Sequence, residues 1–300
     1  MHGHEQRDKH AITVEGLTKT YGPIAALRGA DLTVPAGAVF GLLGPNGAGK
    51  STMIKALVGA LRPSAGTVRV LDRDPLRDRA ALRQTIGYMP QSPALYDDLS
   101  ARANIAFFGR AHDTRLAPRR VDAVLELTDL AARATDPVRT LSGGMQRRVS
   151  LACALAHEPR MLFLDEPTAA VDPVLRARFW RTFRDLAASG VTLFISTHLM
   201  DEALLCDRVA VMRAGTVIAC DTPAALLERG RTRVIVQRGD ATDEQVVGSH
   251  PSDVAAALRR YGLDADVTSV RVEADTLETV IVGLIAAKGE TGTKDKEDAA

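Results

Sequence analysis

Nine consecutive residues near the start of the chain have the composition of a phosphate-binding loop. The stretch "GPNGAGKST" fits the pattern G-x-x-x-x-G-K-[ST] and comprises Gly44, Pro45, Asn46, Gly47, Ala48, Gly49, Lys50, Ser51 and Thr52. Its glycines let backbone amides turn toward phosphate oxygens, and Lys50 supplies positive charge to the β- and γ-phosphates. The Ser51 hydroxyl is expected to bind Mg²⁺, and Thr52 is expected to contact the α-phosphate. This P-loop predicts nucleotide binding, but a kinase, a GTPase, a helicase and a transporter motor would all share it.

Two adjacent acids follow a second apolar run. In "MLFLDE", four apolar residues precede Asp165 and Glu166, and ligands bind at such strand ends in open α/β sheets. Asp165 is the expected partner of Mg²⁺, through water, because this ion usually retains several waters. Glu166 is then placed to act as general base on an attacking water. Together with the P-loop, these acids predict nucleotide hydrolysis.

A second helix start also has the chemistry of a phosphate-binding site. In "LSGGMQRRVSLACALA", the hydroxyl of Ser142 and the bare amides of Gly143 and Gly144 open a helix, whose N-terminal dipole end favours anions. For these three residues alone, a glycine-rich helix start without a ligand is an equal alternative. The chain thus has two candidate phosphate-binding elements, although nothing in it indicates two nucleotides.

The elements that must position these residues alternate between strand and helix. We expect strands at "ITVEGL", "AVFGLLG", "IGYMP", "RMLFLDE", "VTLFIST" and "RVAVM"; several are apolar throughout, which predicts a mostly parallel sheet. Helices are expected at 50–60, 143–156 and 173–188. Between Pro93 and Thr140 the spacing is helical, which predicts a helical insert at about 93–140.

The domain boundaries follow from changes in composition. We place an α/β domain at 11–228 and a small α+β domain at 231–287, with the pattern strand, helix, strand, helix. The polar ends at 1–10 and 288–300 are expected to be disordered.

The order of these motifs resembles that in the nucleotide-binding subunit of an ATP-binding cassette (ABC) transporter. The P-loop, "LSGGM", "LDEPTAAVDP" and the histidine of "ISTHLMDEA" carry the resemblance, which extends from about Ala11 to Ala225. It implies an α/β cassette with a mixed sheet core, a helical subdomain and an antiparallel β subdomain, followed by a small C-terminal α+β appendage. It also implies that two cassettes meet head to tail, so that ATP on one P-loop is held by Ser142, Gly143 and Gly144 of the other. One ATP per chain then requires both phosphate-binding elements.

Four further residues match positions of the family. Tyr21 in "KTYG" resembles the aromatic residue that stacks on adenine, with a structural strand tyrosine as the alternative. Gln91 resembles the glutamine that contacts Mg²⁺ and the water, although it could be an ordinary loop residue. Asp172 resembles the acidic residue at the subunit interface. His198 resembles the histidine that holds the γ-phosphate and orients water, with a satisfied surface histidine as the alternative.

Two residues depart from the family pattern. Met145 stands where many cassettes have glutamine, and Val171 stands where leucine is commoner. Neither change removes a group that takes part in the chemistry, so we expect activity. Both could alter the strength of the cassette dimer.

Composition restricts the location and the partners. The formal charge of +1, from 38 basic and 37 acidic residues, gives no electrostatic basis for binding DNA or RNA. The longest apolar runs are shorter than the roughly 20 residues needed to cross a bilayer, and the first ten residues lack the apolar region of a signal peptide. Three cysteines without metal-ligand spacing are typical of reduced thiols. We expect a cytoplasmic ATPase held at the inner face of the cell membrane by separate membrane subunits.

The resemblance also suggests what the ATPase drives. The stretch "YMPQSPALYDDLSARANIAFFGR" and the ending "TLETVIVGLIAA" resemble the branch paired with ABC-2-type permeases, which favours export over import. Permease docking is expected near 92–103, through Leu95, Tyr96 and Leu99; an internal packing cluster is an equal alternative for these side chains.

Other classes of cassette protein fit the sequence less well. A ribosome-acting cassette protein would normally have two cassettes and a basic linker, and a DNA-repair cassette would contain a long coiled coil. A regulatory module that binds ATP without cleaving it would lack Glu166 or His198. Whether two copies of this chain or two different cassettes pair stays open, as does the transported substrate.

Overall fold

The computed structural model describes residues 10–169, 171–262, 266–284 and 286. It divides the chain into two compact units, with the boundary between Cys220 and Asp221. The predicted disordered ends lie outside the described residues, except for His10, which begins the first strand.

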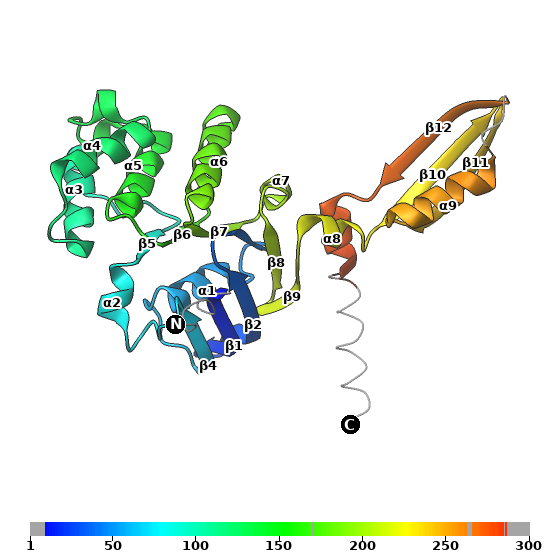
Figure 1. The fold of residues 1–300 in the computed structure, drawn as a ribbon. Helices are drawn as coiled ribbons and strands as arrows, with labels where there is room; N and C mark the ends of the chain where they lie inside the picture. The colour runs from blue at the N-terminus through cyan, green and yellow to red at the C-terminus, as the bar shows by residue number, and fades with distance from the viewer. Residues whose placement is uncertain (1–9, 170, 263–265, 285, 287–300) are drawn as a thin grey trace, which may run out of the picture. The chain divides into compact units, whose positions relative to one another are not determined.

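A six-stranded sheet forms the centre of the larger unit, in the order β5-β6-β7-β3-β8-β9 (Figure 1). The first five strands in this order run parallel to one another. The bounds are β3 (Val39–Leu43), β5 (Ile86–Met89), β6 (Met161–Asp165), β7 (Thr192–Thr197), β8 (Arg208–Arg213) and β9 (Thr216–Asp221). Strands β3, β6 and β7 are buried at every position, as strands covered on both faces must be. The five predicted strands after "ITVEGL" are confirmed as members of this sheet.

A separate antiparallel sheet has the order β2-β1-β4, with bounds β1 (His10–Tyr21), β2 (Ile24–Pro35) and β4 (Ala65–Val70). The prediction that "ITVEGL" joins a mostly parallel sheet is therefore wrong. Only two residues connect β1 to β2, and so short a connection can join only antiparallel neighbours. The helix α1 (Lys50–Leu57) contacts both sheets, and its Met53 and Leu57 pack in one core with Phe163 of β6.

The remaining helices of the larger unit are α2 (Arg79–Arg83), α3 (Ala101–His112), α4 (Pro118–Leu127), α5 (Gly143–Leu155), α6 (Pro173–Ala188) and α7 (Met200–Ala203). Helices α3, α4 and α5 pack together beside the sheet (Figure 1). The helical spacing expected after Pro93 is confirmed by α3 and α4, and the predicted helix at 173–188 is confirmed by α6. Within the part of the chain that the structure describes, no helix is long and apolar enough to span a bilayer.

The buried side chain of Asn104 fixes the segment that enters the helical insert. Its Oδ1 accepts a hydrogen bond from the Tyr96 amide at 2.8 Å. Its Nδ2 donates to the carbonyls of Tyr96, Leu99 and Ser100 at 3.0, 3.3 and 3.1 Å. The side-chain amide of Asn104 thus makes hydrogen bonds with the backbone of a turn that belongs to no strand.

Replacing Asn104 by alanine is expected to lower the free energy of unfolding by about 2–3 kcal/mol, because the Tyr96 amide loses its acceptor and three carbonyls each lose a donor. Urea denaturation followed by circular dichroism measures this. The matched control is Gln84→Ala, at an exposed position at the end of α2. Equal stabilities of the two variants would contradict the role given to Asn104.

The smaller unit contains a three-stranded antiparallel sheet of order β11-β10-β12. Its elements are α8 (Pro223–Leu227), β10 (Arg231–Arg238), β11 (Ala241–Gly248), α9 (Pro251–Tyr261), β12 (Val267–Ala274) and a helix at 277–284. Ala257 of α9 packs against Val234 and Val236 of β10. Strand β11 was not expected from the sequence, because "ATDEQVVG" is mostly polar and exposed.

Candidate active site

The P-loop connects the end of β3 to the start of α1, as the sequence predicts. Two of its glycines are required by geometry. Gly49 has φ 104°, and a Cβ there would lie 2.6 Å from the Ala26 carbonyl oxygen; a Cβ on Gly44 would lie 2.5 Å from that of Met212. No side chain caps α1, so its first backbone amides are available to a phosphate.

A pocket of about 480 Å³ opens at the P-loop, within the size range of small-molecule sites. It brings Gln91 and Glu166 to the P-loop, although both lie far from it in the sequence. Its lining residues are Ile24, Ala25, Ala26, Arg28, Pro45, Asn46, Gly47, Ala48, Gly49, Lys50, Ser51, Thr52, Gln91, Glu166, Ala214 and Gly215. Sequence analysis missed Ile24, Ala25, Ala26 and Arg28, which lie at the start of β2. It also missed Ala214 and Gly215, in the turn between β8 and β9.

The predicted catalytic residues meet at the carboxylate of Glu166. Lys50 Nζ lies 3.3 Å from Oε1. Gln91 Nε2 donates to Oε2 at 3.3 Å, and His198 Nδ1 lies 3.4 Å from the same oxygen. Lys50 is buried and also donates to the carbonyls of Gly44 and Pro45, at 2.7 and 3.2 Å. The site therefore joins one acid to a cation, an amide and an imidazole.

The side chain of Asp165 is held in place by a hydrogen bond from Ser196, a residue that sequence analysis did not single out. The carboxyl of Asp165 is 2% exposed, and Ser196 Oγ donates to its Oδ1 at 2.5 Å. The amide of Glu166 donates to the same hydroxyl at 3.0 Å. Only the pairing of β6 with β7 brings Ser196 here, so spacing in the sequence gives no sign of it.

The residues around Asp165 suit a magnesium ion. Burial, and secondarily the charge of Asp165, raise the pKa of the nearby Tyr88 to about 12. One carboxyl, the Ser51 hydroxyl and the Gln91 amide offer the oxygen ligands that Mg²⁺ takes, with substrate phosphates and water as the remainder. The described residues contain no cluster of three His, Cys, Asp or Glu side chains that could hold a metal alone.

A second buried acid anchors the turn that carries His198. Glu202 is 1% exposed; Thr197 Oγ1 donates to its Oε2 at 2.6 Å, and Thr168 hydrogen-bonds to its Oε1. Thr197 in turn accepts the Leu199 amide at 3.0 Å. Glu202 was not predicted, although an acid four residues after the histidine is visible in "HLMDE".

The Ser-Gly-Gly motif (Ser142, Gly143 and Gly144) does not line this pocket. Ser142 caps α5, with Oγ accepting the Met145 amide at 3.3 Å, and a Cβ on Gly143 would meet no atom within 4 Å. Asp172 caps α6 in the same way, accepting the amides of Val174 and Leu175 at 3.0 Å. Ser142, Gly143 and Asp172 are therefore exposed at the N-termini of two helices of the larger unit.

Tyr21 lies at the end of β1 and is 46% exposed. Lys19 Nζ lies 5.1 Å from the centre of its ring. Tyr21 is not part of the pocket lining, but its pairing partner Ile24 is. Stacking on adenine therefore stays a prediction for this residue.

A strand, a glycine loop and a helix that present a buried lysine, next to an acidic strand end, define a P-loop nucleoside triphosphatase. Comparison with known proteins narrows this class. The sequence profile described as "ABC transporter" matches residues 27–169. A daunorubicin resistance ATP-binding protein of Streptomyces coeruleorubidus is 40% identical over 91% of this chain and 95% of its own length. The Nod factor export ATP-binding protein I of Rhizobium sp. (strain N33) is 37% identical, over 90% of this chain and 85% of its own length.

The fold agrees with the sequence comparison. The dimeric, post-hydrolysis structure of the ATP-binding cassette MJ0796, bound to ADP and Pi, matches with a TM-score of 0.66 and 27% identity, over 70% of this chain and 98% of that one. This chain belongs to the ABC transporter family, as an ATP-binding subunit. It has the ABC cassette fold, binds ATP and is an ATPase coupled to transport.

Proposed function

We propose that two copies of this chain hydrolyse magnesium-bound ATP at their interface and so drive export through separate ABC-2-type permease subunits at the inner face of the cell membrane. The observation that carries the hydrolytic part is the convergence of Lys50, Gln91 and His198 on the Glu166 carboxylate. The drug-resistance and Nod factor export relatives support export.

Each residue of the site has a distinct task in this proposal. Lys50 exchanges its carbonyl partners for phosphate oxygens, which are stronger acceptors. Glu166 accepts a proton from the water whose oxygen attacks the γ-phosphorus, and the bond to the bridging oxygen breaks to release ADP. Gln91 and His198 orient that water and the γ-phosphate. Ser51, Gln91 and Asp165 would hold Mg²⁺, which neutralises developing phosphate charge.

The Ser-Gly-Gly motif is proposed to bind the partner's nucleotide. Ser142 and Gly143 are exposed at the N-terminus of a 13-residue helix, with open space in front of Gly143. A helix end with free amides favours an anion, and a γ-phosphate shared by two chains would stabilise the dimer until it is hydrolysed. The dimeric state of the MJ0796 cassette supports this pairing. We propose that Asp172 also lies at this interface.

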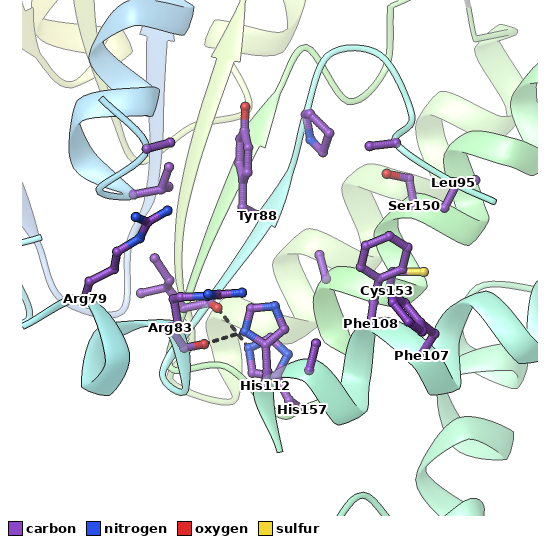
Figure 2. A pocket seen from close by; sticks show the side chains of 17 residues that line it. Arg79, Arg83, Tyr88, Leu95, Phe107, Phe108, His112, Ser150, Cys153 and His157 are labelled. Atoms are coloured by element: carbon purple, nitrogen blue, oxygen red, sulfur yellow. Dashed lines mark hydrogen bonds between the residues drawn. The ribbon is translucent and has the colours of Figure 1, made fainter. Parts of the chain in front are cut away.

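A groove next to the helical insert is the proposed docking site of the permease. This docking groove, of about 650 Å³, lies between α2, α3, α5 and the segment after β5 (Figure 2). Leu95, Phe107 and Phe108 form its apolar side, while Arg79 and Arg83 lie across from them. Phe107 is 48% exposed, which is unusual for a ring of this size.

The groove also contains a pair of stacked imidazoles. The rings of His112 and His157 are 4.3 Å apart and nearly parallel. Burial, and then His112, lower the pKa of His157 to about 4, so the His157 ring is uncharged near neutral pH. Arg79 and Arg83 are the arginines of the groove lining. An apolar wall facing two arginines fits a short permease helix with apolar side chains and an acidic residue.

Of the three docking residues predicted from the sequence, one lines the groove and two do not. Leu95 lines the groove. Tyr96 is exposed, yet its ring also packs on Phe107 and Phe108 with centroids 4.9 and 6.0 Å apart. Leu99 is exposed and lies outside the lining. Tyr96 therefore takes part in internal packing, the alternative to docking posed from the sequence, and is also exposed.

Replacing Phe107 by glutamate is expected to abolish binding to the permease, because a charge enters an apolar contact surface. Hydrolysis by the purified chain should stay within about twofold, since Phe107 does not line the P-loop pocket. The test co-expresses the chain with an ABC-2-type membrane subunit and measures co-sedimentation with membranes. The control is Leu127→Glu, at an exposed apolar position on α4 outside the groove. Wild-type co-sedimentation of Phe107→Glu would contradict this docking site.

A further inference from the structure

Arg147 connects the helix of the Ser-Gly-Gly motif to the backbone of the general base in the same chain. It lies on α5, five residues after Ser142, or about 7.5 Å along the helix axis. Its Nη1 donates to the main-chain carbonyl oxygen of Glu166 at 3.0 Å. No other arginine of α5 contacts Glu166: Arg148 donates instead to Asp129 at 2.9 Å.

The backbone of Glu166 depends on such contacts. Its φ is +50°, a left-handed conformation that is sparsely populated for residues other than glycine and persists only when its surroundings hold it. The amide of Glu166 donates to Ser196 of β7, and the carbonyl accepts from Ala169 at 3.2 Å as well as from Arg147. Of these partners, Arg147 is the one on the helix that begins with the Ser-Gly-Gly motif.

The guanidinium of Arg147 is well placed to transmit a displacement. It is half-buried, and burial lowers the pKa of Arg147 while the charge of Glu166 opposes that effect. A partly desolvated donor cannot exchange its partner for water at low cost, so the contact resists breaking. A shift of α5 would therefore carry the Glu166 carbonyl with it, and small displacements of a catalytic group have large effects on rate.

We propose that Arg147 is a positioning residue that couples the two nucleotide sites of the dimer. The Ser-Gly-Gly end of α5 contacts the partner's ATP, and Arg147 on the same helix sets the position of Glu166 over the chain's own ATP. This coupling rests on the proposed dimer. Hydrolysis at one site thereby depends on occupancy of the other, which appears as positive cooperativity in ATP.

The test compares steady-state hydrolysis by wild type, Arg147→Met, Arg147→Lys and the neighbouring control Arg148→Met. Arg147→Met keeps the apolar stem and removes the donors. It should lower kcat about tenfold with KM within about twofold, and reduce the Hill coefficient toward that of independent sites. Arg147→Lys, which retains a charge and a donor, should recover part of the lost kcat and part of the lost cooperativity. Arg148→Met should retain the wild-type cooperativity, and thermal melting checks the folding of each variant.

Separate outcomes distinguish this inference from the proposed dimer. A wild-type Hill coefficient in Arg147→Met overturns the coupling, as does an equal loss of cooperativity in Arg148→Met. Dimerisation with ATP is measured in parallel by light scattering on Glu166→Gln with Arg147 intact. If that chain stays monomeric, the dimer itself is wrong and the coupling falls with it; if it dimerises, the kinetic comparison decides.

Discussion

Replacing Glu166 by glutamine is expected to lower ATP turnover by about 10²-fold or more, which corresponds to roughly 3 kcal/mol of barrier. Glutamine keeps the shape of the side chain but cannot accept the proton of the attacking water. ATP binding should persist, because Lys50 no longer divides its charge between the phosphates and a carboxylate 3.3 Å away. The variant should therefore accumulate as an ATP-bound dimer, measured as a doubling of mass by light scattering.

Two controls make this result specific. Glu126→Gln, on an exposed face of α4, should leave turnover and dimerisation at the wild-type level. Ser142→Arg in the Glu166→Gln background should keep the chain monomeric, since a large side chain then blocks the exposed start of α5. Near-normal hydrolysis by Glu166→Gln would remove this residue from the mechanism.

Replacing Lys50 by methionine is expected to weaken ATP binding by about 10- to 100-fold, as the loss of a charged hydrogen bond of about 1.5–3 kcal/mol requires. Methionine fills the buried volume but brings no donor to the phosphates. The same change leaves Glu166 without its nearest cation, so turnover at saturating ATP should fall as well. Isothermal titration calorimetry measures the affinity.

The matched control for this variant is Lys55→Met, five residues further along α1 and outside the pocket lining. Its affinity for ATP should equal that of the wild type. An Lys50→Met chain that melts normally and binds ATP within about twofold of wild type would contradict the assignment of Lys50 to the phosphates.

Much of the fold and part of the site were readable from local patterns. Continuous apolar runs indicate strands covered on both faces, which is why β3, β6 and β7 were expected in a parallel sheet. The family resemblance implied an antiparallel β subdomain, which the sheet β2-β1-β4 confirms. Local patterns did not locate the partners of β1, because β2 is interrupted by polar residues and gives no simple alternation. Strand β11 was missed for the same reason.

The sequence by itself determined the P-loop, the adjacent acids and the helix start at Ser142, because each is a contiguous motif whose chemistry and local conformation depend on a few neighbouring residues. Only the tertiary structure decided how Lys50, Gln91 and His198 meet at one carboxylate, and that Ser196, Glu202 and Arg147 hold the site in place. Those contacts join residues on different strands and helices, and the pairing of β6 with β7 and the packing of α5 bring them within hydrogen-bonding distance. Such proximity is a property of the packed chain, which no spacing along the sequence encodes.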